Sequence, residues 1–224
     1  MAALGKIDRA EAYRYMGIRG GADPNTEVLA DECESRLLLA ANPKYCWTFA
    51  EISGASPDGI TLSGHRLTLC GNDIAEHLSG CFGVILLCAT LGTGADKLLR
   101  TVQAEDMAKA LICDALASAA VEQLCENAEA EILVRFPNRF ATWRFSPGYG
   151  DFPLGTQKDF LAAANAQKAI GLCVNDGGIL TPTKSVTAVI GLSETPVEQK
   201  KRGCGTCKMR ERCAYRKTGG RCYE

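Results

Sequence analysis

The chain has 224 residues, of which 46% are hydrophobic and 23% are charged, and its formal net charge is −1. This composition is typical of a folded protein with one domain, or with one domain and an appendage. A net charge near zero, without a basic face interleaved with aromatic side chains, makes nucleic acid an unexpected partner. The longest apolar run, around residues 84–89, is too short to span a bilayer, so we expect no membrane contact either.

The N-terminus has no apolar stretch typical of a signal peptide. The chain contains twelve cysteines. Cysteines without an export signal indicate reduced thiols rather than a disulfide framework. We therefore expect a cytoplasmic protein.

The first half of the chain alternates between helical and strand patterns. Asp8 is placed to cap a first helix, and the apolar residues Val28, Leu29, Cys33 and Leu37, with Leu38, keep helical spacing in a second. The elements expected here are helices over residues 8–17 and 26–41, a strand over 45–52, one or two short strands over 59–70, a short helix over 72–78 and a buried strand over 81–90.

Two features of this half invite a functional interpretation. Gly92-Thr93-Gly94 follows a strand and opens a helix, but it lacks the third glycine of a dinucleotide fingerprint and the spacing of a P-loop. We interpret it as close packing of a strand and a helix. His77 has no neighbouring cysteine or histidine in the sequence, so a surface or structural role is favoured over a ligand or base.

The second half begins with the longest predicted helix, over residues 105–136. Glu122 lies on its stripe of small and apolar residues, with Leu111, Ala115 and Ala119. The spacing alone allows an exposed acid at the helix edge, or a buried carboxylate that needs a partner. The remaining elements expected are a strand over residues 140–145, a helix over 156–170 capped by Thr156, strands over 172–174 and 185–190 separated by a turn at 175–178, and a polar linker over 193–202.

The segment 143–154, WRFSPGYGDFPL, carries the densest chemistry in the chain. Its prolines exclude a helix, and Pro147-Gly148 predicts a turn whose backbone a ligand can approach. Arg144 can form a forked pair with a carboxylate, and Tyr149 offers a flat apolar face with a hydroxyl group. These groups suit a small zwitterion that carries a purine, although an ordinary aromatic-rich connection has the same composition.

These residues resemble a known family. Residues 144–149, RFSPGY, are similar to the R-x-x-x-G-Y motif with which the activation domain of cobalamin-dependent methionine synthase binds S-adenosylmethionine. Residues 119–126, AAVEQLCE, resemble the family helix that supplies an acidic ligand contact, and residues 180–188, LTPTKSVTA, resemble its P-x-x-S-V-S strand. The resemblance covers about residues 5–195.

The resemblance implies an α+β fold with a mixed, mainly antiparallel sheet and packed helices. It implies an S-adenosylmethionine-binding domain over residues 1–195, followed by a linker and tail over 196–224. In this family, cobalt(II) on a cobalamin-dependent methyltransferase is reduced by one electron and remethylated from S-adenosylmethionine. The implied partners are a methyltransferase that lacks its own activation domain and an electron donor such as a flavodoxin or ferredoxin.

The resemblance also implies roles for single residues. Arg144 would bind the ligand carboxylate, and Glu122 would face its amino or sulfonium end. Backbone groups at Ser146 and Gly148 would meet the adenine, and Tyr149 would line the ribose and adenine pocket. The chain departs from the family at residues 189–190, Val-Ile, where the family has an aromatic pair, and an early acidic contact of the family has no aligned counterpart.

The tail contains four cysteines with the spacing C-x2-C-x5-C-x8-C, namely Cys204, Cys207, Cys213 and Cys222. Neighbouring lysines and arginines lower thiol pKa values and offset the charge of thiolates. Four thiolates suit an iron–sulfur cluster or a structural zinc, and a single C-x2-C unit favours the cluster. Disulfides are the third possibility.

Two other functions stay open at this point. One is a non-catalytic protein that docks on a corrinoid protein and delivers electrons through a tail cluster, with its S-adenosylmethionine pocket lost or vestigial. The other is an unrelated iron–sulfur or zinc regulatory protein, which would depend on the tail alone.

Overall fold

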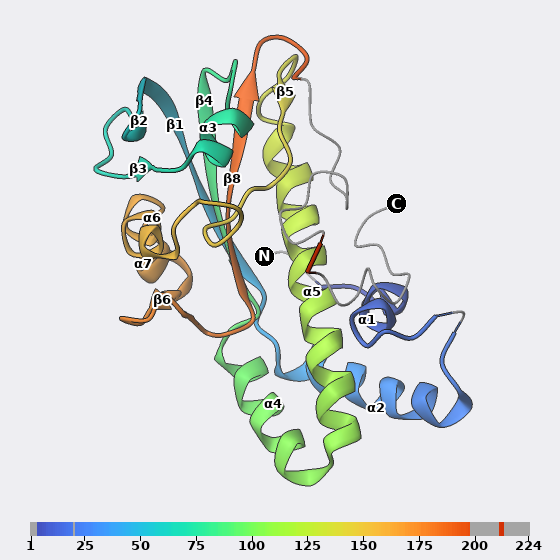
Figure 1. Cartoon of the computed structure of the whole chain (residues 1–224). Coiled ribbons are helices and arrows are strands. Elements are labelled where there is room, and N and C mark those ends of the chain that lie inside the picture. Colours follow the sequence, from blue (N-terminus) through green and yellow to red (C-terminus); the bar gives the residue numbers. More distant parts are fainter. Residues whose placement is uncertain (1–3, 20, 198–210, 213–224) are drawn as a thin grey trace.

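The structure is a computed structural model and describes residues 4–19, 21–197 and 211–212 (Figure 1). Its helices are α1 (Arg9–Tyr15), α2 (Pro24–Ala40), α3 (Asn72–His77), α4 (Thr93–Glu105), α5 (Met107–Leu133), α6 (Gln157–Ala163) and α7 (Ala166–Ile170), with the 3-10 turn η1 (Leu154–Thr156) before α6. Its strands are β1 (Lys44–Ser56), β2 (Gly59–Leu62), β3 (Thr68–Leu69), β4 (Gly83–Thr90), β5 (Phe140–Ala141), β6 (Cys173–Val174), β7 (Leu180–Thr181) and β8 (Ser185–Ser193).

The strands form a 6-stranded sheet in the order β3-β2-β1-β4-β8-β5 and a separate hairpin of β6 and β7. The pairings between these strands are antiparallel throughout the described part of the chain. Helices pack on both faces of the sheet (Figure 1). The predicted α+β class with a mainly antiparallel sheet is confirmed.

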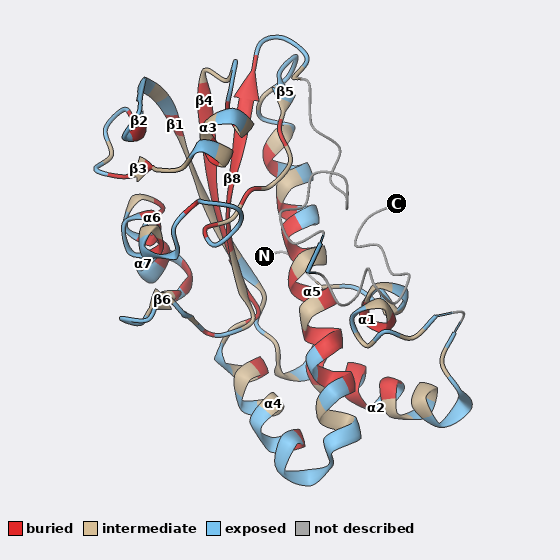
Figure 2. Ribbon diagram, in the orientation of Figure 1, coloured by how far each residue is buried: buried red, intermediate tan, exposed pale blue. Residues whose placement is uncertain are grey.

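The central strand β4 separates two hydrophobic cores. Because successive side chains of a strand point to opposite faces, Ile85 and Leu87 pack in the core with α1, α2 and α5. Val84 and Leu86 pack in the core with α3, α6 and α7. All eight positions of β4 are buried, which explains why its sequence reads as an unbroken apolar run (Figure 2).

Helix α5 is the long helix that the sequence predicts. Its buried face carries small residues such as Ala115, Ala119 and Ala128, which let the helix lie close to its neighbours (Figure 2). It begins after Asp106, whose carboxylate accepts hydrogen bonds from the N–H groups of Ala108 and Lys109 at 2.7 and 3.3 Å. This N-cap separates α5 from α4.

The Gly92–Gly94 turn allows close packing, as the sequence predicts, but between two helices rather than between a strand and a helix. A Cβ atom on Gly94 would lie 1.9 Å from the carbonyl oxygen of Ala40, at the end of α2. Gly92 adopts φ +80°, which disfavours other residues. The glycines therefore let the start of α4 approach the end of α2.

Three sequence predictions are corrected. Helix 156–170 is broken, because Asn165 adopts a left-handed conformation (φ 51°) between α6 and α7. The side chain of Thr156 also makes no capping hydrogen bond. Strand 140–145 is confined to β5 and an isolated bridge between Phe145 and Val189.

Helix α2 buries only some of the apolar residues that keep helical spacing. Cys33 and Leu37 are buried, but the exposed fractions of Val28 and Leu38 are 66% and 38%. Helical spacing identifies which residues share a face, but it does not show how far a neighbouring element covers that face.

Candidate functional site

Arg144 lies between the strand β5 and the turn of the 143–154 segment. The following residue, Phe145, is fixed to the sheet by two backbone hydrogen bonds with Val189, at 2.9 and 2.8 Å. The Phe145 side chain is buried in the core with α3, α6 and α7. Because Phe145 is held on both its backbone and its side chain, it fixes the direction in which Arg144 leaves the sheet.

The guanidinium of Arg144 faces three acids of α5. Nη1 donates to Oε2 of Glu129 at 2.6 Å, and Nη2 donates to Oε2 of Glu122 at 3.2 Å. Glu126 is more distant, with its Oε1 at 4.0 Å from Nη2. Residues 122, 126 and 129 follow helical spacing, so α5 presents them on one face. The structure thus brings together two of the predicted site residues, Glu122 and Arg144.

Burial makes these ion pairs significant. The side chain of Arg144 is 11% exposed, against 22% for Glu129 and 37% for Glu122. Burial alone would lower the pKa of Arg144, but the neighbouring acidic groups, Cys125 first and then the carboxylates of Glu129 and Glu122, outweigh that effect and raise it. Glu122 is therefore neither a simple surface acid nor a fully buried one: it is a half-buried carboxylate with a cationic partner.

The turn after Arg144 is closed by its own backbone. The N–H of Tyr149 donates to the carbonyl of Ser146 at 3.1 Å, and the N–H of Gly148 donates to the carbonyl of Phe152 at 2.8 Å. Gly148 adopts φ +96°, and a Cβ there would lie 3.2 Å from Leu154 Cδ2. The turn predicted at Pro147-Gly148 is confirmed.

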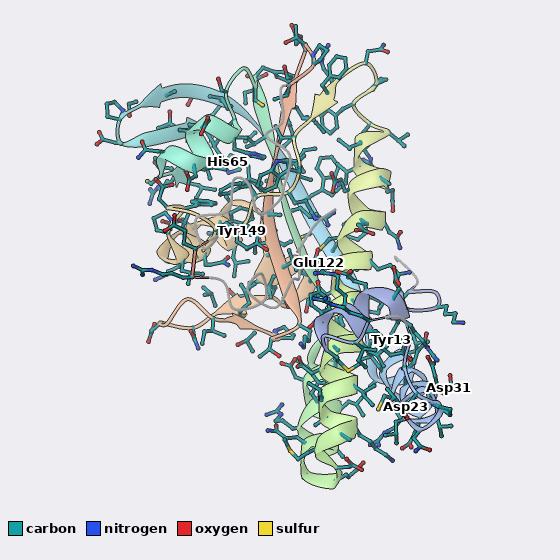
Figure 3. All side chains as sticks on the ribbon, turned by 45° about the vertical axis from the view of Figure 1, so that its right-hand side comes forward. Tyr13, Asp23, Asp31, His65, Glu122 and Tyr149 are labelled. Carbon is teal, nitrogen blue, oxygen red and sulfur yellow. The ribbon has the colours of Figure 1, made fainter. Side chains whose placement is uncertain are left out.

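Tyr149 stands at the surface of this turn. Its side chain is 53% exposed, and its ring meets the Phe145 ring edge-on with centroids 6.2 Å apart. Figure 3 labels Tyr149 and Glu122, which come from the turn and from α5. Tyr149 therefore presents an aromatic surface to solvent beside the segment that carries Arg144.

Helix α3 holds the 143–154 segment at both ends, which the sequence did not reveal. His77 Nε2 donates to the carbonyl of Trp143 at 2.8 Å, and its ring lies 4.4 Å from the Trp143 ring. At the other end, the carboxylate of Asp151 accepts from the N–H groups of Asn72 and Asp73, at 2.8 and 2.9 Å. The expectation of a structural role for His77 is confirmed, because His77 supports the segment.

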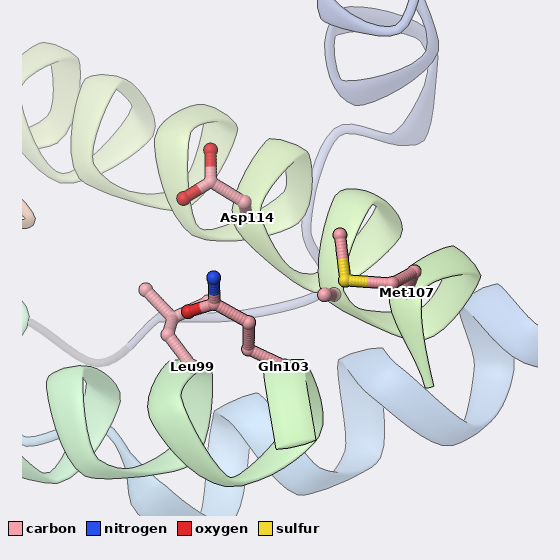
Figure 4. Close-up of a pocket in the computed structure, with 5 residues that line it drawn as sticks. Leu99, Gln103, Met107 and Asp114 are labelled. Carbon is pink, nitrogen blue, oxygen red and sulfur yellow. The ribbon is translucent and has the colours of Figure 1, made fainter. Parts of the chain in front are cut away.

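Two hollows in the described part of the chain lie away from this segment. One, of about 190 Å³, lies between α4 and α5 and is lined by Leu99, Gln103, Met107, Ala110 and Asp114 (Figure 4). The other, of about 220 Å³, lies at the Gly92–Gly94 turn and beside Pro182. Neither includes a residue of the 143–154 segment, and Met107 at the first is 70% exposed.

The tail cysteines Cys204, Cys207, Cys213 and Cys222 lie outside the described residues. Within the described ranges, no group of three or more histidine, cysteine or acidic side chains is arranged to hold a metal ion. The same ranges contain no helix that is long and apolar enough to cross a membrane.

Comparison with solved structures places this architecture in a known class, the fold of reactivation domains. One similar structure is a crystal structure of the MetH reactivation domain bound to AdoHcy (S-adenosylhomocysteine), with a TM-score of 0.63 and 18% sequence identity. It covers 88% of this chain and 76% of that chain. No family model matches the sequence, and no curated protein does. The fold implied by the sequence resemblance is therefore confirmed.

Proposed function

We propose that this chain reactivates a cobalamin-dependent methyltransferase of the methionine synthase type, by reductive methylation of cob(II)alamin with S-adenosylmethionine. One observation carries the proposal. The R-x-x-x-G-Y segment sets Arg144 against Glu122 of α5, and it does so on the fold of a domain that was crystallised with AdoHcy. A cation and an acid at this spacing suit the carboxylate and the amino or sulfonium end of one amino-acid ligand.

The protein would act mainly by positioning. The sulfonium methyl group is already a good electrophile, so this chain need supply neither an acid nor a base. Holding the methyl donor near the partner's cobalt is worth about 7–11 kcal/mol at most. In the proposed step, one electron reduces cobalt(II), the reduced cobalt takes the methyl group from the sulfonium sulfur, and S-adenosylhomocysteine leaves.

The site residues keep the roles that the resemblance implies. Arg144 binds the ligand carboxylate, Glu122 faces its cationic end, and Tyr149 covers the ribose and adenine. Because the Gly148 N–H already donates to Phe152, the adenine would meet the Gly148 carbonyl and the Ser146 N–H instead.

The remaining components lie outside the described residues or outside the chain. The partner is a methyltransferase without its own activation domain, and the electron donor is a flavodoxin or ferredoxin. The tail cysteines bind an iron–sulfur cluster or zinc, and the protein acts in the cytoplasm.

An anaerobic reactivation assay tests the proposal. The full chain, S-adenosylmethionine and a chemical reductant are added to a partner methyltransferase loaded with cob(II)alamin. The proposal expects the methylcobalamin absorbance to appear, with one S-adenosylhomocysteine formed per cobalt. If cobalt is methylated equally fast without the chain, the proposal is wrong.

One observation favours a second function, a docking or electron-transfer protein without methyl transfer. Arg144 is only 11% exposed and already pairs with Glu129 and Glu122, as it would if it served structure alone. S-adenosylmethionine titration separates the two functions, because the docking protein would show no saturable binding.

A further inference from the structure

The pairing of Arg144 with Glu129 raises a question about ligand entry. Glu129 is the closer of its two hydrogen-bonded acids, at 2.6 Å, and it engages Nη1, while Glu122 engages Nη2. A bidentate pair with a ligand carboxylate uses two N–H groups of one guanidinium fork. While Glu129 stays in place, a second carboxylate would meet an arginine whose charge is already balanced and whose fork is in use.

We propose that Glu129 is a resident carboxylate that occupies the ligand-carboxylate position on Arg144, so that S-adenosylmethionine binds by displacing it. This inference rests on the proposed function. It assigns separate tasks to the two acids: Glu122 stays and faces the ligand's cationic end, whereas Glu129 leaves the guanidinium.

The structure supports this division. Glu129 is 22% exposed, so its carboxylate has a path to water once it leaves Arg144. Arg144 itself is 11% exposed, so loss of its 2.6 Å pair with Glu129 without a replacement would be costly. Glu129 therefore stabilises the empty site, and the ligand carboxylate would take its place on Arg144 in the bound one.

Displacement of Glu129 makes the site selective for ligands that carry a carboxylate. A ligand with a carboxylate recovers the pairing that Glu129 gives up. A ligand without one, such as 5′-methylthioadenosine, has nothing to offer Arg144 and leaves Glu129 in place. Glu129 thus sets the affinity for the amino-acid end of the ligand without affecting the nucleoside end.

The test is calorimetric titration of the full chain with S-adenosylmethionine, S-adenosylhomocysteine and 5′-methylthioadenosine. The variant is Glu129→Gln, which removes the competing charge. The matched control is Glu126→Gln, which removes the same charge from the same face of α5 but from a carboxylate 4.0 Å from Arg144 and 69% exposed. Thermal melting verifies that each variant folds, and Glu129→Ser replaces Glu129→Gln if the latter does not.

Relative to Glu126→Gln, the Glu129→Gln variant should bind both carboxylate ligands roughly tenfold more tightly, the equivalent of about 1.4 kcal/mol. Its affinity for 5′-methylthioadenosine should match the control. If the wild type binds S-adenosylmethionine but Glu129→Gln binds it no better than Glu126→Gln, the exchange is refuted and the proposed function stands.

Two other results separate the claims. Binding by Glu129→Gln alone, with none by the wild type, shows that Glu129 blocks the ligand-carboxylate position; it refutes displacement of Glu129 by the ligand and S-adenosylmethionine-dependent reactivation by the natural chain. No binding by either protein refutes the proposed function, and the exchange fails with it.

Discussion

Asp73 and Asp151, which lie 78 residues apart in the chain, form two reciprocal hydrogen bonds. The Asp73 N–H donates to the Asp151 carboxylate at 2.9 Å, and the Asp151 N–H donates to the Asp73 carboxylate at 3.0 Å. The glycines beside them permit this approach. A Cβ on Gly71 would lie 2.7 Å from Asp151 Oδ1, and one on Gly150 would lie 2.0 Å from Asp73 Oδ2. This pair of hydrogen bonds, the Asp73–Asp151 clasp, joins the start of α3 to the turn that carries Tyr149.

Breaking this clasp should loosen the candidate site. Asp151→Ala removes the acceptor for two N–H groups at the start of α3, and losing such a cap costs about 1–2 kcal/mol of unfolding free energy. Urea unfolding measures this loss, and hydrogen exchange of the amides at residues 148, 149 and 152 measures order in the turn. Asp58→Ala, at the exposed β1–β2 turn, is the control. Unchanged exchange in Asp151→Ala would show that the turn orders itself.

Gly94→Ala tests the packing of α4 against α2. The new Cβ would lie 1.9 Å from the Ala40 carbonyl oxygen, so backbone must move. We expect a loss of about 2–3 kcal/mol in unfolding free energy, as for overpacked cores. Gly155→Ala, where a Cβ meets nothing within 4 Å, should change it by less than about 0.5 kcal/mol. Equal stabilities in these two variants would contradict the packing argument.

Glu122→Gln tests the role of this acid in ligand choice. A carboxylate near the sulfonium should favour S-adenosylmethionine over the neutral thioether of S-adenosylhomocysteine. The variant should reduce the ratio of the two affinities and keep its fold, as titration and circular dichroism would show. A ratio that does not move would leave Glu122 as only a structural partner of Arg144.

Deletion of residues 200–224 tests the tail. Binding of S-adenosylmethionine should stay near normal, and reactivation with the natural electron donor should be lost. A strong artificial reductant should restore methylation, because it reduces cobalt without the tail. Loss with the natural donor is expected if the tail holds an iron–sulfur cluster, which can pass an electron, and not if it holds zinc, which has no redox chemistry. Iron, zinc and sulfide are quantified on the intact chain. Normal reactivation of the truncated protein by the natural donor would exclude the tail as the electron path.

Local patterns in the sequence were sufficient for much of the fold. Three features were predicted because their signals lie within a few residues of one another. They are the apolar run of β4, the small-residue stripe of α5 and the turn at Pro147-Gly148. The break at Asn165 was missed, since a single left-handed residue leaves the apolar pattern of α6 and α7 intact.

The candidate site was predictable only in part. Arg144 and Glu122 were identified together through the resemblance, not through their spacing in the chain. Glu129 was missed, although it lies seven residues after Glu122 and so on the same helix face. The support from His77 and Asp73 was beyond sequence reasoning, because their partners Trp143 and Asp151 lie 66 and 78 residues away.

The central claim is that Arg144 binds the carboxylate of S-adenosylmethionine, and anaerobic titration calorimetry of the wild type and Arg144→Ala tests it most directly. The wild type should show saturable binding at one site. Arg144→Ala should bind more weakly by about 1.5–3 kcal/mol, the range for a hydrogen bond to a charged group. Arg144→Lys should recover only part of the loss, because lysine cannot form the fork. Equal affinities of the wild type and a folded Arg144→Ala, or no binding by the wild type, would contradict the claim.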